Sequence, residues 1–170
     1  MKKILPILLL TFLFVNVASC EKDDICVEGD TPLLVIGFFD INNPEQSKDV
    51  PFLRIREVIL DNSINTITDR SSNLDSIGIP LRIDAASTQF AFITNSADDG
   101  TTGEETGNID TLTISYNMRE AFVSRACGFV ANYDDLTVTL PASTSNWIQD
   151  ITIVQQNIEN SNNIHVKIFH

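Results

Sequence analysis

Histidine imidazoles and paired carboxylates are the side chains through which this sequence could catalyse a reaction. It has two histidines, His165 and His170, and no G-x-S-x-G motif accompanies either of them. His165 falls between Ile164 and Val166, an alternation that predicts a solvent-facing position on the last strand. Acidic pairs are numerous, but with 23 acidic and 11 basic residues most belong to a solvated surface, and spacing alone selects no glycosidase pair. We therefore predict no catalytic residue and expect that the protein is not an enzyme.

The start of the sequence carries its most specific motif. Residues 1–19 combine two lysines with a short apolar stretch, a pattern typical of a signal peptide. Its twelve apolar-region residues would form a helix about 18 Å long, too short for a hydrocarbon core about 30 Å thick. Val-Ala-Ser-Cys at positions 17–20 resembles the bacterial lipobox, in which the cysteine becomes the new N-terminus and its sulfur takes a diacylglyceryl group. We predict lipidation at Cys20, with an ordinary secretory peptide as the alternative.

Charged residues follow the predicted lipid cysteine and carry a second signal. They are Glu21, Lys22, Asp23 and Asp24. This run resembles the surface-export signal that follows the lipid cysteine in lipoproteins of the Bacteroidota. It predicts a lipid-anchored outer-membrane protein exposed at the cell surface; the alternative is a plain solvated tether on a protein at the periplasmic face. We assign residues 20–30 to the lipidated tether.

The two remaining cysteines predict a disulfide bond. An exported protein folds in an oxidising compartment, where an even pair of thiols is more often bonded than free. A bond between Cys26 and Cys127 would close a loop of about 100 residues, which stabilises a fold by up to about 4–5 kcal/mol in the chain-entropy model. Neither cysteine lies in a C-x-x-C motif, so the pair favours a structural role over redox chemistry.

One aromatic side chain and one polar loop are the candidates for ligand contact. Trp147 lies in a connection rich in Ser, Thr and Asn, so we select it as a candidate contact; the alternative is a tryptophan that covers the rim of the core. Residues 96–108, SADDGTTGEETGN, supply carboxylate oxygens of the kind that calcium binds, but the D-x-[DN]-x-[DN]-G pattern is absent. We predict no metal site and no cofactor.

Alternation of apolar and polar residues indicates that β-strands position these groups. Strict alternation occurs at 112–116, 136–140 and 164–168, whereas 33–39 is apolar on both faces and is predicted as a central strand. Turn clusters separate these segments, and no stretch of ten residues has convincing helical spacing. Residues 31–170 are therefore predicted to form an all-β domain, an antiparallel β-sandwich of about seven to nine strands. The cysteines lie too far apart for a true immunoglobulin domain.

Composition and charge narrow the function classes. The chain has 170 residues, 43% of them hydrophobic, which suits one globular domain. Its net charge is −12, and removal of residues 1–19 takes away two lysines and leaves 9 − 23 = −14. Such a charge argues against nucleic-acid binding, which needs a clustered basic face.

Several short segments carry a resemblance to a known group of proteins. They are Cys20 and Cys26, Thr31-Pro32-Leu33, Ile79-Pro80-Leu81, Leu112–Tyr116, Cys127-Gly128-Phe129 and Ile164–Ile168. With these segments the chain resembles small Bacteroidota outer-membrane lipoproteins that carry a domain of unknown function. The resemblance implies no catalytic residue, since the family has no assigned activity.

These observations predict a membrane-anchored lipoprotein that serves as a structural or protein-interaction module at the outer membrane. The membrane contact is the lipid, and the expected partner is an outer-membrane protein, because open strand edges can pair with another chain. The alternative is a surface module that binds a glycan or a peptide.

Overall fold

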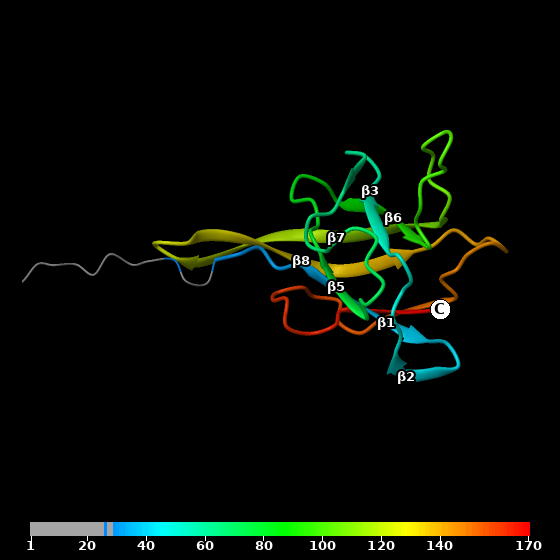
Figure 1. Ribbon diagram of the computed structural model, residues 1–170. Coiled ribbons are helices and arrows are strands. Elements are labelled where there is room, and N and C mark those ends of the chain that lie inside the picture. The colour runs from blue at the N-terminus through cyan, green and yellow to red at the C-terminus, as the bar shows by residue number, and fades with distance from the viewer. Residues whose placement is uncertain (1–25, 27–28) are drawn as a thin grey trace, which may run out of the picture.

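The computed structural model describes Cys26 and residues 29–170 (Figure 1). The predicted signal peptide (1–19), the lipid cysteine Cys20 and the export signal (21–24) lie outside the described residues. The described part contains ten β-strands. It has no helix long and apolar enough to cross a membrane. The all-β prediction is confirmed.

The first sheet has five strands. They are β1 (Leu34–Asp40), β2 (Asn43–Ser47), β5 (Ser76–Ile79), β9 (Asp150–Ile153) and β10 (Val166–Phe169). Their order is β2-β1-β10-β9, and β5 also pairs with β1. β1 runs parallel to β10 and antiparallel to β5 and β2, so it lies in the interior of its sheet as its two apolar faces predict.

The second sheet is a continuous antiparallel ladder. Its strands are β3 (Arg54–Glu57), β4 (Asn62–Ser63), β6 (Ser87–Thr94), β7 (Asn108–Ser124) and β8 (Gly128–Thr139), in the order β4-β3-β6-β7-β8. β7 and β8 form a long hairpin whose register shifts at two points. In Figure 1 the far end of this hairpin projects well beyond the rest of the molecule.

One buried apolar cluster joins the two sheets. β1 contributes Leu34 and Phe38, β6 contributes Phe90, and β7 contributes Leu112 and Ile114. Each of these side chains is at most 1% exposed. Because every second residue of a strand faces the same side, the alternation in the sequence places these residues between the sheets. This arrangement confirms the β-sandwich. The described residues form ten strands, above the predicted number of about seven to nine, and the count includes the short strands β2 and β4, which are exposed throughout.

His165 corrects one prediction. It is fully buried rather than solvent-facing, and its Nδ1 accepts a hydrogen bond of 3.0 Å from the backbone N–H of Val35. β10 begins only at Val166, and the backbone of His165 bonds to β1 on one side and to residues 154–155 on the other. Alternation fails to predict the burial of His165 because β1 and residues 154–155 enclose the chain on both sides. Burial lowers the pKa of His165.

Candidate functional site

The predicted disulfide is present and lies at the far end of the β7–β8 hairpin. Cys26 and Cys127 are bonded, with their Cα atoms 4.9 Å apart. Gly29 lies against the bond: a Cβ there would approach the sulfur of Cys26 to 2.5 Å. A side chain at this position would displace the disulfide, so glycine allows the N-terminal segment to turn beside it.

The hairpin beyond the sandwich, which we call the distal hairpin (residues 117–130), is the least covered part of the second sheet. Its turn is set by Gly128, whose φ of 72° favours glycine, and by Ser124, whose hydroxyl accepts the backbone N–H of Cys127 at 3.0 Å. Phe122 and Phe129 are directly paired across the strands, with ring centroids 5.4 Å apart. They are 61% and 66% exposed, so this aromatic pair faces solvent.

The N-terminal segment follows the hairpin toward the first sheet. The hydroxyl of Thr31 accepts the backbone N–H of Ala131 at 3.4 Å, and the backbone N–H of Leu33 donates to Ser161 at 2.8 Å. A cleft of about 410 Å³ lies between this segment, β8 and residues 159–162. The chain therefore runs from the disulfide along the hairpin before it enters β1.

Arginines and carboxylates form a network at the other end of the molecule. Arg54 donates to Asp69 at 2.7 Å and to Glu105 at 3.1 Å, while Arg70 pairs with Asp98. Hydrogen bonds from the arginines hold the pKa values of Asp69 and Asp98 below the usual range of a carboxyl. Burial opposes such a shift at Glu105, but Ser96 and two backbone amides lower the pKa of this residue as well.

This network occupies the acidic loop considered for calcium. Asp98 and Glu105 serve as acceptors for arginines, and Asp99 accepts the backbone N–H groups of Thr101 and Thr102. Among the residues that the structure describes, no group of three or more His, Cys, Asp or Glu side chains could hold a metal ion.

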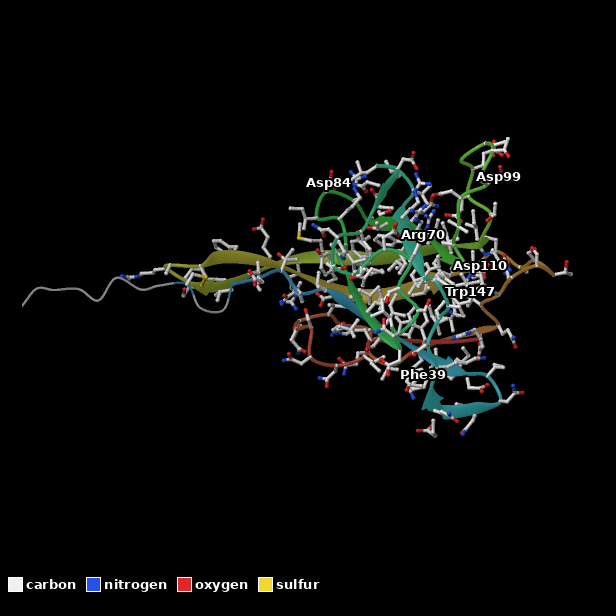
Figure 2. All side chains as sticks on the ribbon, viewed as in Figure 1. Phe39, Arg70, Asp84, Asp99, Asp110 and Trp147 are labelled. Atoms are coloured by element: carbon white, nitrogen blue, oxygen red, sulfur yellow. A yellow bond between two sulfur atoms is a disulfide. The ribbon has the colours of Figure 1, made fainter. Side chains whose placement is uncertain are left out.

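Trp147 is half-buried, and Figure 2 labels it next to Asp110. Its Nε1–H donates to the carbonyl of Phe92 at 3.1 Å, and its ring meets His170 edge-on at 5.6 Å between centroids. The next residue, Ile148, donates its backbone N–H to the carboxylate of Asp110 at 2.8 Å. These contacts bind the tryptophan to the rim of the core; ligand contact at Trp147 stays a prediction.

A groove of about 570 Å³ opens next to Trp147. Val138 and Leu140 of the β8 end form one wall, and Asp150 and Ile151 of β9 form the other. β9 is the last strand in the order of its sheet, so one edge carries no neighbouring strand in the described residues. The corresponding edge of β8 is covered only further along, where residues 156–158 bond to Tyr133 and Leu136. The groove thus lies between two uncovered strand edges.

A second cleft contains a buried carboxylate that the sequence analysis missed. Glu57 is 6% exposed and lines a cleft of about 410 Å³ together with Arg82 and Thr88. Its Oε2 accepts the backbone N–H of Leu60 at 3.0 Å, whereas Oε1 has no hydrogen-bond donor within the described part of the chain. Arg82 lies 3.9 Å from Oε1 but pairs more closely with Asp84, at 2.8 Å.

The alternation of β3 contained the signal for Glu57. Leu53 and Ile55 share one face of this segment and are buried. Position 57 is next in the same phase, so period-two spacing assigns this glutamate to the core face. Charged residues rarely face the core, so this position could have been identified from the sequence as a candidate functional residue.

Comparisons with known proteins give a family and no assigned activity. No curated protein matches the chain. No solved structure matches it either. The model of a family described as "Family of unknown function (DUF6452)" matches residues 54–170, which covers β3 to β10 and both walls of the groove beside β9. Because this match spans more than two thirds of the chain, the protein belongs to the DUF6452 family of unknown function.

Proposed function

We propose that the protein is a lipid-anchored module of the outer membrane that presents its β-sandwich to a membrane-protein partner. The observation that carries this proposal is the Cys26–Cys127 bond. It ties the folded domain to a point six residues after the predicted lipid cysteine, Cys20. A tether of six residues spans at most about 20 Å when fully extended. The domain would then stay close to the membrane, where a short tether gives a high effective concentration of membrane partners.

The uncovered edge of β9 supports a protein partner. An extended segment can add to such an edge through backbone hydrogen bonds, and side-chain pockets beside it then give specificity. The groove next to β9 offers apolar side chains in Val138, Leu140 and Ile151, and polar ones in Asp150 and Gln149. This combination suits a partner strand with alternating side chains.

Anchoring is tested by fractionating cells that express the Cys20→Ala protein. The proposal predicts that the variant leaves the membrane fraction, because the lipid provides the hold. The control is the Cys26→Ser/Cys127→Ser double variant, which lacks the clamp but keeps the lipid and should remain with the membrane. A Cys20→Ala protein that stays in the membrane would refute the anchor. Protease shaving of intact cells then distinguishes surface exposure from a periplasmic orientation.

Partner binding is tested by site-specific photo-crosslinking in intact cells. A crosslinking residue at Ile151, on β9, should capture one defined outer-membrane protein. The matched control is Ile109. It is also an isoleucine on a strand and is exposed, whereas Ile151 is partly exposed, and it lies outside the groove. Equal capture at both positions, or none at Ile151, would count against the β9 edge.

The cleft around Glu57 favours ligand binding as a second candidate function. A buried carboxylate oxygen without a donor is costly, and a hydroxyl or amide N–H of a glycan or peptide would satisfy it. A glycan and peptide array tests this candidate. Binding that is lost in Glu57→Gln but kept in Trp147→Ala would place the ligand in this cleft, whereas the reverse would favour Trp147.

A further inference from the structure

We propose that the distal hairpin contacts the lipid surface directly and sets the orientation of the domain on the membrane. The contact consists of the Phe122–Phe129 pair, with Val123 and Arg125 at the turn. This inference rests on the proposed lipid anchor at Cys20 and extends it from a flexible attachment to a defined pose.

The distal hairpin exposes large apolar side chains that are not part of the buried core. Phe122 and Phe129 are each more than 60% exposed, and Met118 and Val123 are also exposed. The two aromatic rings contact each other. The end of the β7–β8 hairpin projects beyond the rest of the two sheets (Figure 1). An exposed aromatic pair on a projecting β-hairpin is well shaped to enter a lipid interface, where apolar side chains lie about 5–10 Å deep.

Charge distinguishes the distal hairpin from the rest of this acidic protein. Residues 117–130 contain two of the eleven basic residues and one of the 23 acidic ones. Arg119 pairs with Asp134 and Glu159, but Arg125, at the turn, has no ion pair within the described part of the chain. A cation beside exposed aromatic residues is complementary to anionic lipid headgroups.

The disulfide places these residues next to the anchor. Cys127 lies two positions from Phe129 and two from Arg125, and its partner is Cys26. Cys26 lies six positions after Cys20, so Cys127 at the turn of the hairpin lies within about 25 Å of the lipid attachment. This covalent proximity, together with Arg125, favours the bilayer over a second copy of the chain as the occupant of the aromatic surface.

The contact orients the domain rather than holding it. Two aromatic side chains and one arginine alone bind a membrane only weakly, so stable attachment requires the lipid as well. The acidic loop and its arginine network lie at the opposite end of the molecule, as the labels of Arg70 and Asp99 in Figure 2 show. A membrane-bound distal hairpin therefore turns the acidic loop away from anionic lipid.

The test uses tryptophan fluorescence of the lipidated protein in vesicles of brominated phosphatidylethanolamine and phosphatidylglycerol. Phe129→Trp reports the distal hairpin. Ile109→Trp is the matched control, because it lies on the same strand as Phe122 but thirteen residues away, about 40 Å along β7. Trp147 is present in both proteins and provides a common background.

We expect the bromines to quench about half or more of the emission added by Phe129→Trp, and little of that added by Ile109→Trp. Arg125→Ala in the Phe129→Trp protein should weaken quenching in anionic vesicles and leave it unchanged in phosphatidylcholine. Phe122→Trp provides a second reporter should Phe129→Trp fold poorly.

Three outcomes would overturn the inference. Equal quenching of the reporter and the control, in a protein whose mass shows lipid at Cys20, removes the hairpin contact and leaves the anchor intact. A dimer that shields the reporter without bromine quenching assigns the aromatic surface to a second copy. A protein without lipid at Cys20 removes the proposed anchor and this inference together.

Discussion

The distal hairpin and the opposite end of the molecule differ in what holds them together. The distal hairpin has a covalent clamp, an exposed aromatic pair and one acidic residue. The opposite end has no covalent clamp among the described residues; Arg54 and Arg70 there bind three carboxylates from two loops. A projecting hairpin has little core to stabilise it, so a disulfide suits it. Loops that sit against the sandwich can use half-buried ion pairs instead.

The largest effect is expected from the clamp. The Cys26→Ser/Cys127→Ser variant should lose about 2–5 kcal/mol of unfolding free energy, because its unfolded chain is no longer closed into a loop of about 100 residues. Chemical denaturation measures this loss. Proteolysis should then cut first in residues 117–130, and a variant with unchanged protection there would show that the clamp does not hold the hairpin.

A smaller loss is expected from Arg54→Ala. The side chain of Arg54 is 18% exposed, and its removal leaves Glu105, itself mostly covered, without this partner. We expect a loss of about 1.5–3 kcal/mol, typical of hydrogen bonds to charged groups. The control is Arg119→Ala in the distal hairpin, where the exposed pairs should contribute about 0–1 kcal/mol. Equal losses would contradict the contrast between the two ends.

Stability should also fall as the pH drops below about 6.5. Burial lowers the pKa of His165, so between that pKa and the ordinary histidine value of about 6.5 the unfolded chain binds more protons than the folded one. The unfolding free energy therefore decreases from pH 7 toward pH 5.5. His165→Asn keeps an acceptor for the N–H of Val35 but does not titrate, so thermal melts of this variant should depend less on pH. An unchanged pH dependence would assign the effect to other groups, such as His170, whose pKa burial also lowers.

The smallest effect is expected from the exposed aromatic pair. Phe129→Ala should cost only about 0.2–1 kcal/mol, the range for a cross-strand pair. Phe90→Ala, in the buried cluster, should cost about 3–5 kcal/mol. Denaturation of the two variants separates them. A large loss at Phe129 would mean that the pair stabilises the fold and is not kept for an external contact.

Alternation in the sequence was sufficient for strands that have one face in the core. Leu112–Tyr116 lies in β7 and residues 136–139 lie in β8, and the disulfide follows from the two cysteines that remain beside the predicted lipid cysteine. The full length of the hairpin could not be predicted, because residues 117–120 are all exposed and carry no apolar period. The burial of His165 was misjudged because it depends on β1 and on residues 154–155, which enclose this position from both sides. Glu57 was missed although the period of β3 assigns it to the core face.

A mass measurement on one cross-linked peptide tests the central claim most directly. Chymotrypsin, which cuts after aromatic residues and leucine, should release residues 20–33 from the mature, non-reduced protein, and residues 123–129 from the hairpin. We predict one species in which these peptides are joined through Cys26 and Cys127 and the first carries lipid on Cys20. A joined species without lipid would contradict the anchor, and a lipidated peptide that runs free of 123–129 would contradict the clamp.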